Sequence, residues 1–428
     1  MRTRRILVRL TALSLFSLGG LGVPELTLAE PLTLESAWRL AEQNSPEIKR
    51  AIAARESAHG ETQDARALLY NNPELNLEGR QRRLFQIEQT DAVRRDWAVG
   101  IAQTFEIAGQ QSYRREAADV ALAALEQEID QTRRRVRAEV ESRFVHVLAL
   151  QSRIDTERRT LELIEHNTQL ANKRVELGED SQLDGNLAVV DTERARNQLA
   201  LLQEQLTRAR ADLAIQLQLP APELPAVIGE LMPRTANDTL DGLLAAVAAR
   251  PDIRSLELRE QSARSRLDQE RAARYPDITV NLMRSREEGI EGRDTVTTLG
   301  FSLPLPVFRQ NAAGIGRAAM ELTQFQIDKM TTARDARTSV VAAWQRRESL
   351  RERVKRLVEV VYPKMEENFS LSRRAFQDGE IGLPQLLLVQ RQTLDAQRDL
   401  VEAQLELRLT QIELNYAAGE STDQPNVD

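Results

Sequence analysis

Three histidines and six methionines, with no cysteine, are the side chains of this 428-residue sequence that could ligate a soft or borderline metal ion. His59, His146 and His166 are scattered along the chain, whereas zinc, cobalt and copper sites need several such ligands close together. A lone histidine is more often a helix-surface residue than a ligand. The sequence therefore predicts neither a resident metal ion nor a cofactor.

The sequence shows no recognisable catalytic motif either. The sequence contains no glycine-rich phosphate-binding loop and no nucleophile elbow, and no carboxylate pair stands out among its 65 acidic residues. We therefore expect that the protein is not an enzyme.

The elements that hold these side chains are expected to be long helices. Only 4% of the residues are aromatic and 29% are charged, which is little material for several compact cores. Ala, Leu, Gln, Glu and Arg dominate, as they do in long helices and coiled coils. Most of the chain should therefore pack helix against helix.

Residues 1–29 have the pattern of a secretory signal peptide. Four arginines precede an apolar run from Leu10 to Gly22, and Thr27-Leu28-Ala29 offers a small-residue cleavage site. The alternative is an uncleaved membrane anchor, for which the run is short. Removing the four arginines and one glutamate of this segment changes the net charge from −7 to −10. An exported, acidic chain is not expected to bind nucleic acid, and without cysteine it has no disulfides.

The remaining sequence contains an internal repeat of about two hundred residues, the self-similarity that a fold assignment must consider first. The matching segments are Ser45-Pro46-Glu47-Ile48 with Arg250-Pro251-Asp252-Ile253, Asn72-Pro73-Glu74-Leu75 with Tyr275-Pro276-Asp277-Ile278, Val99-Gly100-Ile101 with Leu299-Gly300-Phe301, and Gly178-Glu179 with Gly379-Glu380. We assign the first repeat to residues 30–226 and the second to residues 227–418. The tail, 419–428, is short and polar and is predicted to be disordered.

Each repeat is predicted to contain a helix followed by two strands. The helix covers about Leu34 to Leu69 in the first repeat and about Leu240 to Arg274 in the second. Alternation of apolar and polar residues, typical of strands, then begins. The alternating residues are Leu75, Leu77, Trp97, Val99 and Ile101, and in the second repeat Ile278, Val280, Leu282, Thr297, Leu299, Phe301 and Leu303.

A long helical hairpin is predicted after each strand pair. The first arms run from about Gln110 to Leu177 and from about Asn311 to Asp378, interrupted only by Pro363, and each would reach about 100 Å. They end at Gly178 and Gly379, where a second helix returns to Leu219 or Ala418. Coiled-coil spacing is kept by Leu161, Ile164, Thr168, Ala171 and Val175, by Leu199, Leu202, Leu206, Ala209 and Leu213, and by Leu400, Ala403, Leu407, Thr410 and Leu414.

Two prolines separate the last strand from the second long helix. Pro304 and Pro306 cannot donate to a strand ladder, so we expect the sheet to end there and the helix to begin only beyond Phe308. The first repeat has Thr104 and Glu106 at the matching positions and reaches Gly109 before its helix. The two strand-to-helix transitions are therefore predicted to be built differently.

Four strands with one apolar face leave costly unpaired edges if they stand alone. Strands of about ten residues in an exported protein fit an outer-membrane barrel that several chains close together. A soluble β-hairpin packed on a helical bundle is the alternative reading.

The repeat, the signal segment, the strand pairs and the glycine-tipped hairpins resemble the TolC-type outer-membrane efflux channel family over essentially the whole mature chain. The resemblance implies a mainly α fold with a small β part. In it, three chains close a trimeric transmembrane β-barrel with four strands each, and the long hairpins form an α-barrel that crosses the periplasm. It also implies outer-membrane lipid around the barrel, a periplasmic adaptor (membrane fusion) protein and an inner-membrane pump of the resistance-nodulation-division type.

Two segments of the sequence indicate which branch of the family the chain resembles most. GFSLPLPVFRQNAAGIGRA (residues 300–318) and FEIAGQQSYRREA (residues 105–117) resemble the branch serving heavy-metal resistance pumps of the cobalt-zinc-cadmium type. Phe308-Arg309-Gln310-Asn311 departs slightly from that branch's usual residues. The implied function is passive export of heavy-metal cations. The alternatives are a channel for drugs or other small organic toxicants and, more remotely, a periplasmic coiled-coil adaptor or structural protein.

The resemblance also implies roles for the hairpin tips and for an acidic ring. Adaptor-contacting turns would lie at Val175, Gly178 and Ser181 and at Gly379 and Ile381, although these positions must form tight turns in any case. The family's acidic gate positions are Gln385 and Leu388 here. Asp184 and Asp191, seven residues apart on nearly one helix face, are candidates for a ring of carboxylates around the lumen; a solvated outward face is equally consistent.

Overall fold

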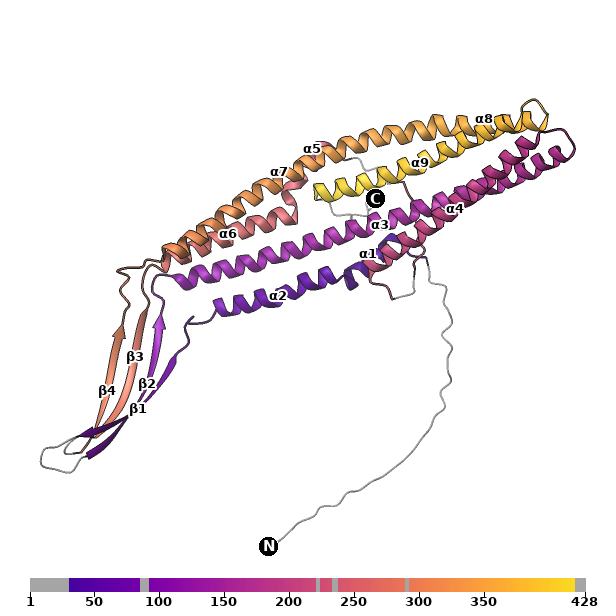
Figure 1. Ribbon diagram of the computed structural model, residues 1–428. Helices are drawn as coiled ribbons and strands as arrows, with labels where there is room; N and C mark the ends of the chain where they lie inside the picture. Colours follow the sequence, from indigo (N-terminus) through magenta and orange to yellow (C-terminus); the bar gives the residue numbers. More distant parts are fainter. Residues whose placement is uncertain (1–30, 85–91, 221–223, 233–237, 289–291, 420–428) are drawn as a thin grey trace, which may run out of the picture.

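The protein is an elongated molecule with a sheet at one end and two helical hairpin tips at the other (Figure 1). The computed structural model describes residues 31–84, 92–220, 224–232, 238–288 and 292–419. The predicted signal peptide and all but Gly419 of the predicted tail lie outside these residues. The described elements follow the same order twice, from short helices through two strands to a long hairpin, as the internal repeat predicts.

The first helical segment of each repeat is broken, and the prediction of one continuous helix was wrong in both. Helix α1 (Leu34–Asn44) ends before α2 (Pro46–Ala65), and α5 (Leu240–Ala246) passes through a 3₁₀ turn, η1 (Val247–Ala249), before α6 (Pro251–Ala272). Pro46 and Pro251 stand at the first position of the new helix. A proline there lacks the N–H that would continue the preceding helix, but fits the start of a new one.

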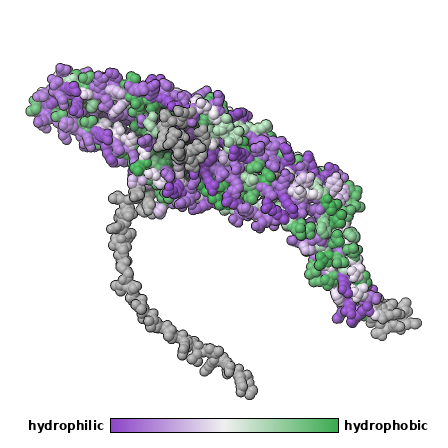
Figure 2. Space-filling model, turned by 180° about the vertical axis from the view of Figure 1, so that it is seen from behind, coloured by the Kyte–Doolittle hydropathy of each residue, from purple (hydrophilic) through white to green (hydrophobic). Residues whose placement is uncertain are grey.

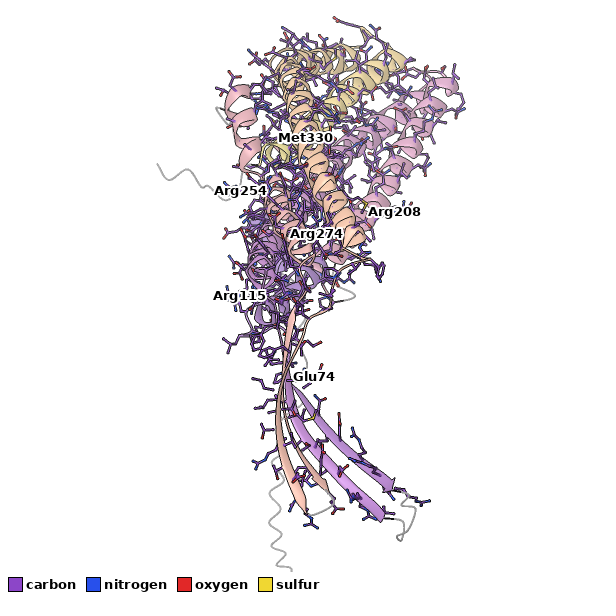
Figure 3. The ribbon with its side chains drawn as sticks, turned by 90° about the vertical axis from the view of Figure 1, so that its left-hand side faces the viewer. Glu74, Arg115, Arg208, Arg254, Arg274 and Met330 are labelled. Atoms are coloured by element: carbon purple, nitrogen blue, oxygen red, sulfur yellow. The ribbon has the colours of Figure 1, made fainter. Side chains whose placement is uncertain are left out.

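The four described strands form one antiparallel sheet in the order β1-β2-β3-β4. They are β1 (Glu74–Leu84), β2 (Ala92–Phe105), β3 (Ile278–Glu288) and β4 (Arg293–Ser302). The two repeats join through β2 and β3, which pair from Trp97 opposite Arg286 to Phe105 opposite Ile278. The sheet leaves β1 and β4 as its edges and curves along its length (Figure 3).

The hairpins match the predicted lengths closely. Helix α3 (Gln110–Glu176) has 67 residues and so extends about 100 Å; α4 (Gln182–Leu217) returns from its tip. In the second repeat the outgoing arm is α7 (Ala312–Arg356), a π-helical turn η2 (Leu357–Val361) and α8 (Tyr362–Gln377), and α9 (Leu383–Ala418) returns. Pro363 is the second residue after the π-helical turn, which accommodates its missing N–H without ending the helix.

The core is a set of narrow seams between helices, because the molecule has no single centre. Helix α3 packs against α2, α4, α6 and α9, and α7 packs against α6 and α9. The predicted coiled-coil positions lie on these seams: Ile164, Ala171, Leu202, Leu213, Ala403, Leu407, Thr410 and Leu414 are buried. Among the described helices, none is long and apolar enough to cross a membrane.

Candidate functional site

The sheet has two faces of opposite character. On the outward face, defined here by the side chains that stay exposed in the single chain, lie Leu75, Leu77, Trp97, Val99, Ile101, Leu282, Leu299 and Phe301. The strand register aligns them, with Leu75 opposite Ile101 and Leu282 opposite Leu299. On the inner face, Asp96, Ala98 and Ala102 are buried. Figure 2 shows the hydrophobic surface concentrated over the sheet, with hydrophilic surface covering most of the helices.

Apolar exposure continues past the strands toward the helices. Residues 303–310 form neither strand nor helix, so β4 stops two residues before Pro304 and α7 starts beyond Phe308. Leu305 and Val307 are exposed, and Phe308 is 97% exposed. A side chain of that size in water would cost about 1.5–3 kcal/mol relative to burial, which indicates that this end of the sheet has another environment.

The two strand-to-helix transitions share one structural feature, although prolines precede only the second. Gly109, which precedes α3, has φ 81°, and Asn311, which precedes α7, has φ 55°. Asparagine tolerates this left-handed conformation better than most residues. Its side-chain amide also donates to the backbone carbonyl of Glu270 at 2.9 Å. In both repeats, a left-handed residue turns the chain from the strand direction into the long helix.

In the first repeat, Arg114 stabilises the transition from β2 to α3. Arg114, on the first turn of α3, pairs with Glu106 through two N–H donors and stacks over the ring of Tyr70 at 3.5 Å. Glu106 occupies the position that matches Pro306 of the second repeat. The first repeat therefore orients its transition with an ion pair where the second uses prolines.

At the far end of the molecule, the two hairpin tips are built alike. Gly178 and Gly379 both have φ 76°, and the next residue donates back to the helix, Glu179 N–H to Arg174 O at 2.9 Å and Glu380 N–H to Ala375 O at 2.8 Å. This is a Schellman turn, which favours glycine at its left-handed position. No atom lies within 4 Å of where a Cβ would stand at either glycine, so the backbone is open to a partner.

The two hairpin tips pack against each other through a shared apolar cluster. Ala171, Ala188, Phe376, Leu383 and Leu386 share a buried cluster, and Ile381 packs against it. Arg174 of the first tip pairs with Asp180 at 3.1 Å and also lies 5.1 Å from the Phe376 ring of the second tip. Val175 and Ser181 flank the first glycine, and Leu177 and Leu183 are exposed beside it. A rigid, partly apolar end of this kind suits docking to another protein.

The two candidate ring carboxylates have separate structural tasks. Asp184 belongs to a capping box at the start of α4, in which its carboxylate accepts from the Ser181 N–H at 3.3 Å and the Ser181 hydroxyl accepts from the Asp184 N–H at 3.2 Å. Asp191 is buried and pairs with Arg391 of α9, whose Nε lies 3.0 Å away. The structure therefore does not bring the two carboxylates to one shared contact.

Asp191 belongs to a ladder that sequence reasoning missed. Three arginines of α9 each reach a buried carboxylate of the first repeat. The pairs are Arg391 with Asp191, Arg398 with Glu157 at 2.6 and 3.0 Å, and Arg408 with Glu141 at 2.8 Å. Asp191 and Arg391 are 200 residues apart, close to the repeat offset. The nearly equivalent positions of Asp191 and Arg391 in the two repeats were the one sign of this ladder in the sequence. The other two pairs could not be predicted, because they depend on how the hairpins pack.

Burial and pairing change the pKa of two groups of this ladder, Glu141 and Arg398. The Glu141 side chain is 6% exposed, and burial raises the pKa of its carboxyl, while the Arg408 guanidinium acts in the opposite direction. For Arg398, burial lowers the pKa, but the Glu157 and Asp395 carboxylates together outweigh that effect and the pKa is raised overall. Each arginine thus compensates a charge that would be costly to bury alone.

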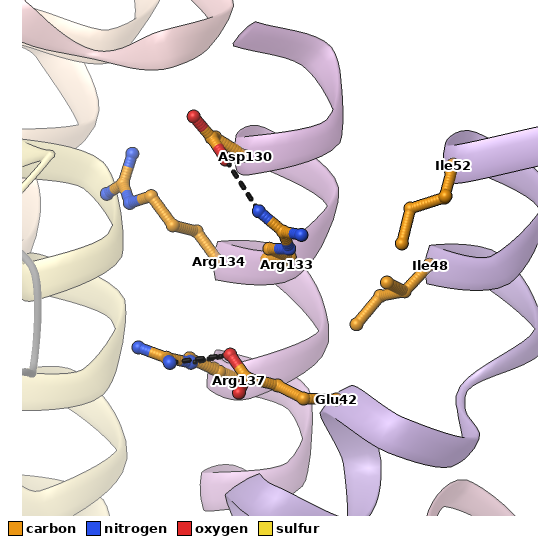
Figure 4. A pocket seen from close by; sticks show the side chains of 7 residues that line it. All are labelled: Glu42, Ile48, Ile52, Asp130, Arg133, Arg134 and Arg137. Atoms are coloured by element: carbon orange, nitrogen blue, oxygen red, sulfur yellow. Dashed lines mark hydrogen bonds and ion pairs between the residues drawn. The ribbon is translucent and has the colours of Figure 1, made fainter. Parts of the chain in front are cut away.

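A cavity of about 490 Å³ lies between α3 and the corner of α1 and α2, lined by Glu42, Ile48, Ile52, Asp130, Arg133, Arg134 and Arg137 (Figure 4). Its arginines already have acceptors. Arg133 pairs with Asp130 at 3.0 Å, Arg137 donates to Glu42 at 2.9 Å, and Arg134 donates to the Tyr416 carbonyl at 3.1 Å. The cavity therefore offers no free cation to an anionic ligand.

The histidines stay apart in the structure. His59 is exposed on α2, and His146 and His166 are exposed on α3. Desolvation by neighbouring residues lowers the pKa of His146. Within the described ranges, no three histidine or acidic side chains gather in a way that could hold a metal ion. The remaining candidates for function are thus the outward face of the sheet and the hairpin tips.

Comparison with known proteins gives the same architecture. The sequence model of a family described as outer membrane efflux protein matches residues 37–217 and 243–420. The outer membrane protein VceC of Vibrio cholerae has a similar structure, with a TM-score of 0.74 and 18% identity, covering 91% of this chain and 96% of that one.

Two curated relatives differ in their named substrates. The chain is 25% identical over 381 residues to the cobalt-zinc-cadmium resistance protein CzcC of Cupriavidus metallidurans, covering 86% of this chain and 85% of that protein. It is 27% identical over 333 residues to the pyoverdine export outer membrane protein OpmQ of Pseudomonas putida, covering 73% of this chain and 68% of that protein.

Proposed function

Because the chain belongs to the outer membrane efflux protein family, whose members lie in the outer membrane and extend into the periplasm, we propose that it is the outer-membrane channel of a tripartite efflux system that exports heavy-metal cations. The observation that carries this proposal is the sheet, whose outward face is apolar near the helices and whose edge strands β1 and β4 each leave one edge unpaired among the described strands.

The sheet supports a homotrimer. An open edge in lipid leaves backbone N–H and C=O groups unsatisfied, at several kcal/mol each. Pairing β4 of one copy with β1 of the next removes every such edge when the ring closes. Three copies with four strands each would give twelve strands, an even number suited to a transmembrane barrel.

The helical part would then form the periplasmic tunnel. Helix α3 is about 100 Å long and lies beside α9 of the second hairpin, so three copies would enclose a conduit with the tips farthest from the membrane. We assign Val175, Gly178, Ser181, Gly379 and Ile381 to docking on a periplasmic adaptor, which would connect the tunnel to an inner-membrane pump. The open glycine backbones and the shared cluster beneath them support this assignment.

The metal substrate follows from similarity to CzcC, which covers most of both chains. A conduit conducts best when it binds its cargo weakly, so selection would lie in the pump, and no catalytic step is assigned to this chain. The similarity to OpmQ supports the alternative, a channel for a small organic molecule. In a deletion strain, the first assignment predicts lower tolerance of zinc, cobalt and cadmium. The second predicts lower tolerance of drugs or other small organic toxicants.

We also propose that one of the two candidate carboxylates, Asp184, forms an acidic ring around the lumen. Asp191 is neutralised by Arg391, which leaves Asp184, near the first tip, as the stronger candidate to face the lumen. Single-channel conductance of Asp184→Ala, measured with and without divalent cations, tests this. Unchanged block by divalent cations would remove Asp184 from the pore.

Each segment of the chain has a role in the proposed channel. Residues 1–29 would direct export and be cleaved, residues 30–226 and 227–418 would each supply two strands and one hairpin, and residues 419–428 would form the disordered tail that the sequence predicts. Fractionation tests the core of the proposal: the mature protein should appear in outer-membrane fractions as a heat-modifiable trimer. A monomer in the soluble periplasmic fraction would contradict it.

A further inference from the structure

The outward face of the sheet is not apolar along its whole length. At the end of the strands away from the helices, the register continues the same face with charged residues: Arg284 opposite Val99, Arg286 opposite Trp97, and Arg95 opposite Gln81. Five arginines lie on this face, which we call the outer arginine patch: Arg83, Arg95, Arg284, Arg286 and Arg293. In Figure 2, hydrophilic surface replaces the hydrophobic surface toward this end.

The patch is strongly unbalanced in charge. Along the described strands, the outward face carries one acid, Glu288, whose carboxylate lies 3.7 Å from Arg293. Five arginines and one glutamate leave four positive charges. The inner face is different, because Arg82 pairs with Asp96 at 3.0 Å and further acids, Glu74, Glu78, Glu287 and Asp294, lie on it. The excess of arginine is therefore specific to the side that would face lipid.

Barrel closure would not neutralise the patch. The outward residues of edge strand β1 are Leu75, Leu77, Gly79, Gln81 and Arg83, and those of edge strand β4 are Arg293, Thr295, Thr297, Leu299 and Phe301. Neither set contains an acid. A neighbouring copy would therefore add more arginine beside this patch and no carboxylate from its edge strand.

The patch also has a defined height in the membrane. The apolar band extends from Phe308 and Leu305, near the helices, to the row of Ile101 and Leu282. Arginine enters the face in the next row, where Arg284 lies opposite Val99. If the helices occupy the periplasm, as proposed above, the patch stands at the outer leaflet. Unpaired arginines there would be unfavourable, unless headgroup anions meet them as their side chains extend toward the interface.

We propose that the outer arginine patch binds the phosphate groups of the glycolipid in the outer leaflet. A guanidinium presents its N–H donors in a planar fork that matches two phosphate oxygens. Several guanidinium groups at one height on the barrel wall could each bind a phosphate, so they suit a lipid that carries more than one phosphate. The occupant is the phosphorylated headgroup of a membrane lipid, and the proposal rests on the proposed outer-membrane insertion.

The test compares lipid binding by the purified trimer and by variants. The probes are diphosphoryl lipid A, monophosphoryl lipid A and phosphatidylcholine, each in mixed micelles, with retained lipid counted by native mass spectrometry. Arg284→Gln combined with Arg286→Gln removes two forks from the patch. The matched control is Arg80→Gln, at the same height on the inner face opposite Asp96.

The expected result is that the wild-type trimer and Arg80→Gln retain diphosphoryl lipid A most strongly, while the double variant binds it at least tenfold more weakly, a loss of about 1.4 kcal/mol. Inorganic phosphate at equal concentration should not compete, because it lacks the acyl chains that contact the apolar band. Equal retention by the double variant, or equal retention of phosphatidylcholine, would overturn the proposal.

The two proposals fail in different ways. If the wild-type protein forms no heat-modifiable trimer in the outer membrane, the channel assignment fails, and the patch assignment fails with it. If the trimer forms but shows no preference for phosphorylated lipid, the patch assignment fails alone. If the double variant does not assemble, Arg286→Lys, which keeps the charge and loses the fork, should assemble and bind diphosphoryl lipid A more weakly than the wild type; equal binding would overturn the role of the fork.

Discussion

Replacing Arg408 by methionine removes the partner of a buried carboxylate and keeps a long, flexible side chain in its place. Glu141 would then stay buried, 6% exposed, without the guanidinium that now lies 2.8 Å away. Removing one member of a buried pair typically costs about 3–5 kcal/mol. We therefore expect a clear fall in thermal stability of the detergent-solubilised protein at neutral pH.

The size of this loss should depend on pH. Burial raises the pKa of Glu141 above that of an unfolded carboxyl, and losing Arg408 raises it further. Between the ordinary and the raised pKa the folded state binds more protons than the unfolded state, so stability falls as pH rises through this window. Below the ordinary carboxyl pKa, Glu141 is neutral in both states and the cost of losing Arg408 becomes small.

The assay is thermal unfolding followed by circular dichroism, from pH 4 to pH 8, with Glu141→Gln and the double variant Glu141→Gln/Arg408→Met as controls. The double variant should recover much of the loss seen for Arg408→Met at pH 8, because replacing a buried pair is far less costly than breaking it. An equal loss at every pH, or no recovery in the double variant, would refute the reasoning.

Three further predictions concern the ends of the molecule. Asn311→Ala should lower stability by about 1–3 kcal/mol through left-handed strain and a lost hydrogen bond, and Asn311→Gly by less, as calorimetry would show. Valine at both Gly178 and Gly379 should abolish adaptor cross-linking, since both have φ 76°; unchanged cross-linking would exclude docking there. Leu299→Arg, on the outward face, should cost about 2–4 kcal/mol in bilayers; if Thr298→Arg on the inner face costs as much, the assignment of faces fails.

Much of the fold was predictable because its signals are local. Alternation identified the strands, the absence of proline identified the long helices, and the glycines marked the tips. Pro363 was the one proline inside the two predicted outgoing arms of the hairpins, and the structure passes it with a π-helical turn. The breaks before Pro46 and Pro251 were missed because an apolar pattern can continue across a change of helix axis.

The site was less predictable because it depends on packing between distant segments. Asp191 reads as a surface acid until Arg391 is placed beside it, and Glu141 and Glu157 stand among many acids in a polar helix. The left-handed conformation of Asn311 was missed because the hydrogen bond from its side chain to the Glu270 carbonyl joins segments that only the packed structure brings together. The outer arginine patch required the strand register, since a one-residue shift would move every arginine to the inner face.

The central claim is that this chain conducts heavy-metal cations across the outer membrane, and the most direct measurement is the rate at which metal-loaded cells release zinc, cobalt and cadmium. A deletion strain that keeps its adaptor and pump should release these ions much more slowly than its parent, and expression of the wild-type chain should restore the rate. Release at the parental rate from the deletion strain would contradict the account.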